Sequence, residues 1–173
     1  MNKTLLAAAA IGLFAISTPI CAQQMATKQQ LVGTWKVVTL KATSGGKVSM
    51  PLGEHPAGYV SITPTRIWLL FVDSTRKAPA APSLTDAEAI AAMKSSVAWT
   101  GKYVTSDQTP DGLKLTSHVD TASSEALNGT DRVYFMRVDG NKLMMKSPGV
   151  IVPMTGALSI VEIELVKADH DRY

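Results

Sequence analysis

Most of the chain is a succession of short runs in which apolar and polar residues alternate, with turn residues between them. In "LVGTWKVVTLKA", Trp35 and Val37 fall on one face and Thr34 and Lys36 on the other. An alternation with a period of two is typical of a β-strand that is buried on one side only. This pattern constrains the fold more than any other feature of the sequence.

The same pattern recurs toward the C-terminus, and turn signals separate the runs. The segment "YVSITPTRIWLLFV" reads as two strands joined near Pro64, because proline has no N–H to donate to a central strand ladder. Asp139-Gly140-Asn141 is a strong hairpin signal between two further runs. The run 67–72 is apolar on both faces, which predicts that its outer face is covered by a helix, a loop or another subunit.

One helix is expected, in "TDAEAIAAMKSSV". Thr85 and Glu88 have the spacing of a capping box, and Ile90, Met93 and Val97 share one helical face. We expect this helix to cover the outer face of 67–72; a lid over an open barrel end is the alternative.

These elements predict an all-β chain of about eight strands with one short helix. An antiparallel up-and-down barrel fits this count, because closing the sheet leaves no exposed strand edges. The interior of an eight-stranded barrel is either filled by side chains or holds one small ligand. Both outcomes remain open from the sequence.

The N-terminal segment has the pattern of an export signal. Lys3 precedes an apolar stretch too short to span a bilayer, and small residues around Ala22 offer a cleavage site. We therefore expect a signal peptide at 1–22 and a periplasmic or secreted protein without its only cysteine, Cys21; lipidation of that cysteine is the alternative.

The remaining chain is expected to form one domain. A linker at 23–30 would lead into a barrel at 31–167, followed by a polar tail at 168–173. The formal net charge is +3 with no dense Lys/Arg block, so no nucleic-acid partner is indicated. No further apolar run is long enough for a membrane span.

Four stretches carry a resemblance to a known family. They are "LVGTWKVV", "PLGEHPAGYVSITPTR", "WTGKYVTS" with "LTSHVD", and "DRVYFMRVDGNKLMMKSP". Together they resemble the bacterial and fungal lipocalin-like domain family, over about 31–167. The resemblance implies a lipocalin-like β-barrel in which Trp35, of the Gly33-x-Trp35 motif, plugs the closed end. Lipocalin barrels often pack an arginine from the last strand over this tryptophan; here Lys167 stands in that region and could replace it through its stem and charge.

The resemblance and the side-chain pattern suggest that the barrel binds a small hydrophobic, aromatic molecule. The candidate ligand-binding residues are aromatic and methionine side chains and one arginine: Tyr59, Trp68, Trp99, Tyr103, Arg132, Met136 and Met145. Arg132 and Arg137 lie on opposite faces of one strand, so at most one points inward, where it could hold an anionic group of a ligand.

A cofactor-independent enzyme (an isomerase or cyclase, a hydrolase or a lyase) acting on a hydrophobic molecule is the alternative. It would use His118 as the acid/base, assisted by Glu162 or Tyr134. If Leu113, Leu115 and Val119 point inward, however, His118 is an exterior residue. Glu162 likewise reads most simply as part of an outward acidic stripe. A fully packed barrel that acts only through protein contacts is a third possibility.

No metal site, cofactor motif or dinucleotide fingerprint is predicted. The three histidines, His55, His118 and His170, are dispersed, and no Cys or His stands at ligand spacing to any of them. A small hydrophobic molecule is therefore the expected partner, and a homo-oligomer remains possible.

Overall fold

The computed structural model describes residues 26–79, 81–152 and 154–168. The predicted signal peptide with Cys21, most of the predicted polar tail, and His170 lie outside these residues. The strands are β1 (Gly33–Ser44), β2 (Lys47–Ser49), β3 (Ala57–Ile62), β4 (Arg66–Val72), β5 (Ser96–Thr109), β6 (Gly112–Ala122), β7 (Asp131–Asp139), β8 (Lys142–Lys146), β9 (Val150–Ile151) and β10 (Leu158–Lys167). The helices are α1 (Lys28–Leu31), α2 (Asp86–Lys94) and the 3₁₀ turn η1 (Glu125–Leu127).

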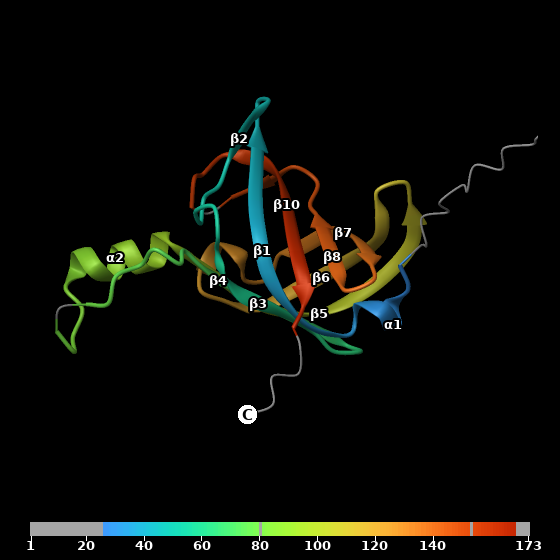
Figure 1. Ribbon diagram of the computed structural model, residues 1–173, viewed down its shortest axis with the longest axis horizontal. Helices are drawn as coiled ribbons and strands as arrows, with labels where there is room; N and C mark the ends of the chain where they lie inside the picture. Colours follow the sequence, from blue (N-terminus) through green and yellow to red (C-terminus); the bar gives the residue numbers. More distant parts are fainter. Residues whose placement is uncertain (1–25, 80, 153, 169–173) are drawn as a thin grey trace, which may run out of the picture.

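Within the described part of the chain, eight strands close into an antiparallel barrel. Their order is β1-β3-β4-β5-β6-β7-β8-β10, and β10 pairs back onto β1, with the short strands β2 and β9 attached at one end. Strands β1 and β10 lie side by side although they come from opposite ends of the domain (Figure 1). The predicted up-and-down barrel of about eight strands is therefore confirmed.

The barrel core follows the alternation seen in the sequence. In β4, Ile67, Leu69 and Phe71 are buried while Trp68 and Leu70 are 43% and 46% exposed. No described helix or loop covers these two outward side chains, so two of the three expected covers are absent from the described residues, and cover by another subunit stays a prediction.

The closed end of the barrel is built around Trp35, as the family motif implied. Trp35 is fully buried, and its indole Nε1 donates a hydrogen bond to the Leu31 carbonyl at 2.8 Å. The ammonium group of Lys167 lies 4.9 Å from the centroid of the Trp35 ring, so Lys167 does take the place expected for an arginine. Leu31, at the end of α1, is also fully buried, and Ala26, within the stretch predicted as a linker, is buried in the core as well.

Helix α2 begins with the predicted capping box between Thr85 and Glu88. It projects away from the barrel (Figure 1), and none of its residues is buried. Ile90 and Met93 are more than half exposed, and Val97 belongs to β5 instead of the helix. The expectation that α2 covers the wall was therefore wrong, since no side chain of the helix is buried against the barrel and its apolar face carries only two large side chains, Ile90 and Met93. None of the helices in the described ranges has the length and apolar character needed to cross a membrane.

Candidate ligand-binding cavity

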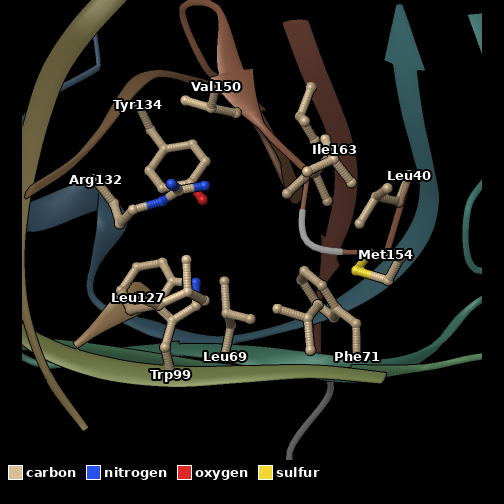
Figure 2. Close-up of a pocket in the computed structure, with 13 residues that line it drawn as sticks. Leu40, Leu69, Phe71, Trp99, Leu127, Arg132, Tyr134, Val150, Met154 and Ile163 are labelled. Atoms are coloured by element: carbon tan, nitrogen blue, oxygen red, sulfur yellow. The ribbon is translucent and has the colours of Figure 1, made fainter. Parts of the chain in front are cut away.

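A cavity of about 50 Å³ lies inside the barrel, at the end opposite Trp35, and is partly open to solvent. Its walls come from strands on both sides of the barrel, from η1 and from the segment around β9 (Figure 2). Thirteen residues line it: Leu40, Leu69, Phe71, Val97, Trp99, Leu127, Arg132, Tyr134, Val150, Val152, Met154, Val161 and Ile163.

The cavity exists because the two ends of the barrel are filled differently. At the closed end, Trp35, Leu115, Leu143 and Leu165 are buried and fill the interior. At the open end, Leu40, Leu69, Phe71 and Trp99 line the interior, and the space between them stays unfilled.

A rim segment between β8 and β10 completes the cavity. Val150, Val152 and Met154 of this segment line the cavity, and Val150 lies across it from Leu69 and Phe71 (Figure 2). The segment is held by a turn in which the Val152 carbonyl accepts from the backbone N–H groups of Thr155 and Gly156.

Arg132 and Tyr134 bring polarity to this otherwise apolar cavity. Both project inward from β7, with the guanidinium beside the phenol hydroxyl (Figure 2). Arg132 is half-buried; its Nε is enclosed and has no hydrogen-bond partner, and no acidic side chain in the described residues pairs with it. Arg137, on the same strand, is exposed and bonds to backbone carbonyls outside the barrel.

The ionisation of Tyr134 reflects this environment. Burial raises the pKa of its phenol, while the charge of Arg132 and a hydrogen bond with the Arg132 side chain act in the opposite direction. The net pKa is raised, so the phenol is neutral at physiological pH.

Trp99 adds a flat aromatic face beside Tyr134. The two ring centroids are 6.1 Å apart and the ring planes are inclined by only 10°. Trp99 projects from β5 and Tyr134 from β7, so the two rings line one side of the cavity.

The structure places two of the three acid/base candidates outside the cavity. His118 is exposed on the outer face of β6 and pairs with Asp131 through a 2.9 Å contact to its Nδ1. The reason is the one foreseen as an alternative: Leu113, Leu115 and Val119 occupy the inner face.

Glu162 is also exposed, on the outer face of β10, because Ile163 and Leu165 take the inward positions. Tyr134 alone of the three lines the cavity.

The seven predicted ligand-binding residues fall into three groups. Trp99 and Arg132 line the cavity. Tyr59 and Trp68 point outward, 41% and 43% exposed, because β3 and β4 turn their neighbouring residues inward. The other three, Tyr103, Met136 and Met145, are buried in the core and do not line the cavity.

Several lining residues were not singled out from the sequence. Leu69, Phe71 and Ile163 could have been found from the two-residue period of β4 and β10, because these side chains occupy alternate positions that face the barrel interior. Val150, Val152 and Met154 carry no such signal, because they lie in a rim segment whose position depends on tertiary packing. Across the described ranges, no three His, Cys, Asp or Glu side chains are grouped so as to hold a metal ion.

Comparison with known proteins agrees with this architecture. A family model described as a lipocalin-like domain matches residues 32–162, which cover seven of the eight barrel strands in full and the first half of β10. Neither curated proteins nor solved structures include a match to the chain.

Proposed function

The chain belongs to the lipocalin-like domain family, and from this premise we propose that it binds a small hydrophobic molecule in the cavity at the open end of its barrel. The observation that carries the proposal is the cavity itself, with apolar side chains around most of its wall and the flat ring of Trp99 at one side. An apolar cavity with few polar groups is the usual form of a small-molecule site.

The volume of the cavity limits what fits. About 50 Å³ is less than the roughly 150 Å³ of an apolar cavity that encloses a benzene molecule. A ligand therefore inserts one slim end, or it displaces the rim segment around β9. The rim segment around β9 is a short connection whose backbone hydrogen bonds are mostly local, so we expect it to be the part of the wall that yields to a ligand.

Binding is favoured over catalysis by the placement of the acid/base candidates. The enzyme alternative needs His118 as its base, and that side chain faces solvent on the outside of the barrel. Tyr134 is in the cavity, but its raised pKa makes it a poor base at neutral pH.

We also propose that the chain is exported and that its first 22 residues are removed. The support for this is the charged, apolar and small-residue order of the N-terminal segment. The same mass measurement that tests binding reads the N-terminus, since cleavage after Ala22 gives a chain that begins at Gln23.

Native mass spectrometry of the protein purified from cells that export it tests the proposed function. We expect one extra small-molecule mass per chain, which is lost on denaturation. Val97→Phe should remove it by filling the cavity from β5, whereas Val104→Phe, on the outer face of the same strand, should not. No extra mass in the wild type, or an extra mass that both variants retain, would contradict the proposal.

A further inference from the structure

We propose that the cavity recognises an apolar monocarboxylic acid, whose carboxylate is bound by Arg132 and Tyr134. This inference rests on the proposed function and narrows it from any hydrophobic molecule to one that carries a single negative charge.

The charge of Arg132 has no acidic partner among the described residues. An arginine that is partly withdrawn from water among apolar side chains raises the free energy of the folded chain unless an anion or hydrogen-bond acceptors compensate it. Arg66, on β4, is compensated by Asp120 at 2.7 Å, and Arg137 by backbone carbonyls. Arg132 has no acidic partner in the described residues, and its enclosed Nε has no acceptor. A ligand carboxylate would supply both the negative charge and the hydrogen-bond acceptor that Arg132 lacks.

Tyr134 and Arg132 present their donors side by side. The Arg132 guanidinium lies beside the Tyr134 hydroxyl (Figure 2), and because a guanidinium only donates, the phenol oxygen is the acceptor in any hydrogen bond between the two. The phenol hydrogen then remains available for a second oxygen. Arg132 and Tyr134 together therefore present N–H and O–H donors side by side, which suits the two oxygens of a carboxylate.

Among the described residues, the remaining wall of the cavity carries no charged side chain. Away from these two residues the cavity is lined by aliphatic, aromatic and thioether side chains, among them Leu69, Phe71 and Met154. A second charge on the ligand would find no cation there, so the wall selects for a single acidic group on an apolar body.

The test compares trans-cinnamate with its neutral counterpart trans-cinnamamide by isothermal titration calorimetry at pH 7. The two probes have nearly the same shape and differ in charge. Each is larger than the cavity, so both must displace the rim segment to the same extent in order to bind. We expect wild-type protein to bind the acid about tenfold more tightly than the amide, since hydrogen bonds to charged groups are about twice as strong as neutral ones. Arg132→Gln should abolish this preference, Tyr134→Phe should reduce it, and Arg137→Gln should leave it unchanged.

The outcomes separate this inference from the proposed function. If the wild type binds both probes equally, carboxylate recognition is overturned while hydrophobic binding stands. If neither probe binds, both proposals fail. Should Arg132→Gln unfold the barrel, Arg132→Lys takes its place in the test. It keeps the charge without the planar fork of the guanidinium, so it should retain part of the preference for the acid.

Discussion

The ammonium group of Lys167 lies 4.9 Å from the ring centroid of Trp35, and the same Nζ donates to the Val32 carbonyl at 3.4 Å. The last strand of the barrel thereby holds down the tryptophan that plugs its closed end. The cation–π contact uses the charge of Lys167, and its stem packs beside Gly33, where an added Cβ would come within 3.1 Å of the Lys167 Cε. The glycine and the lysine are therefore parts of one arrangement.

Replacing the charge at this position should weaken the closed end slightly. We expect Lys167→Met, which keeps much of the stem, to lower the free energy of unfolding by about 0.5–1 kcal/mol, and Lys167→Arg to stay near the wild-type value. Urea unfolding followed by circular dichroism measures both. Equal losses in the two variants would mean that the charge contributes nothing here.

Gly101 should tolerate no side chain. A Cβ at this position would lie 2.1 Å from the His118 carbonyl oxygen of the neighbouring strand and 2.7 Å from Ser117 Oγ. We expect Gly101→Ala to reduce the free energy of unfolding by about 1–3 kcal/mol or more through this overpacking.

Gly149→Ala is the matched control, since neither glycine has a positive φ and the atom nearest to an added Cβ at Gly149 is 3.5 Å away. Its effect should stay within about 0.5 kcal/mol. A thermal or urea melt in which Gly101→Ala matches this control would contradict the packing described for β5 and β6.

His118 should be dispensable for both folding and binding. Its side chain and that of Asp131 are each 64% exposed, and exposed ion pairs contribute about 0–1 kcal/mol. We expect His118→Ala to change the unfolding free energy by no more than that and to leave the affinity for trans-cinnamate unchanged. A large loss of affinity in the calorimetric titration would place His118 in the site, against the geometry.

Alkaline pH should destabilise the barrel through its buried tyrosines. Burial raises the pKa of both Tyr103 and Tyr134, so the stability they contribute is fully present below the ordinary tyrosine pKa of about 10. Above that pH the unfolded chain releases these protons first, and stability falls by up to about 1.4 kcal/mol per pH unit and per group.

The double variant Tyr103→Phe with Tyr134→Phe should lose stability less steeply than the wild type above pH 10. Part of the difference in unfolding free energy between the double variant and the wild type is independent of pH, because Tyr103→Phe also removes the 2.8 Å hydrogen bond that Tyr103 donates to the Thr63 carbonyl. Parallel curves of unfolding free energy against pH would show that neither phenol is held neutral by the fold.

Much of the barrel was predictable because strand alternation is a local property. The pattern around Trp35 and the hairpin at Gly140 predicted strands and turns that the structure contains, and the family motif identified the plug. The placement of α2 was not predictable in the same way. Its capping box is local and formed as expected, whereas the packing of Ile90 and Met93 depends on a partner surface that its own sequence does not specify.

The candidate site was only partly predictable for a related reason. The opposite facing of Arg132 and Arg137 followed from their spacing on one strand, but which of them points inward depends on the register of the closed barrel. Aromatic character alone was a poor guide, since Tyr59 and Trp68 face solvent. The rim residues Val150 and Met154 reach the cavity from outside the barrel strands, and no periodic signal marks them.

The central claim is that the open-end cavity is the binding site, and methyl chemical-shift mapping by NMR during titration with trans-cinnamate tests it most directly. The account predicts shifts in the methyl groups of Leu69, Val150 and Ile163, which line the cavity, and none in Leu70 or Val104 on the outer face. Shifts confined to the outer face, or no shifts at all, would contradict it.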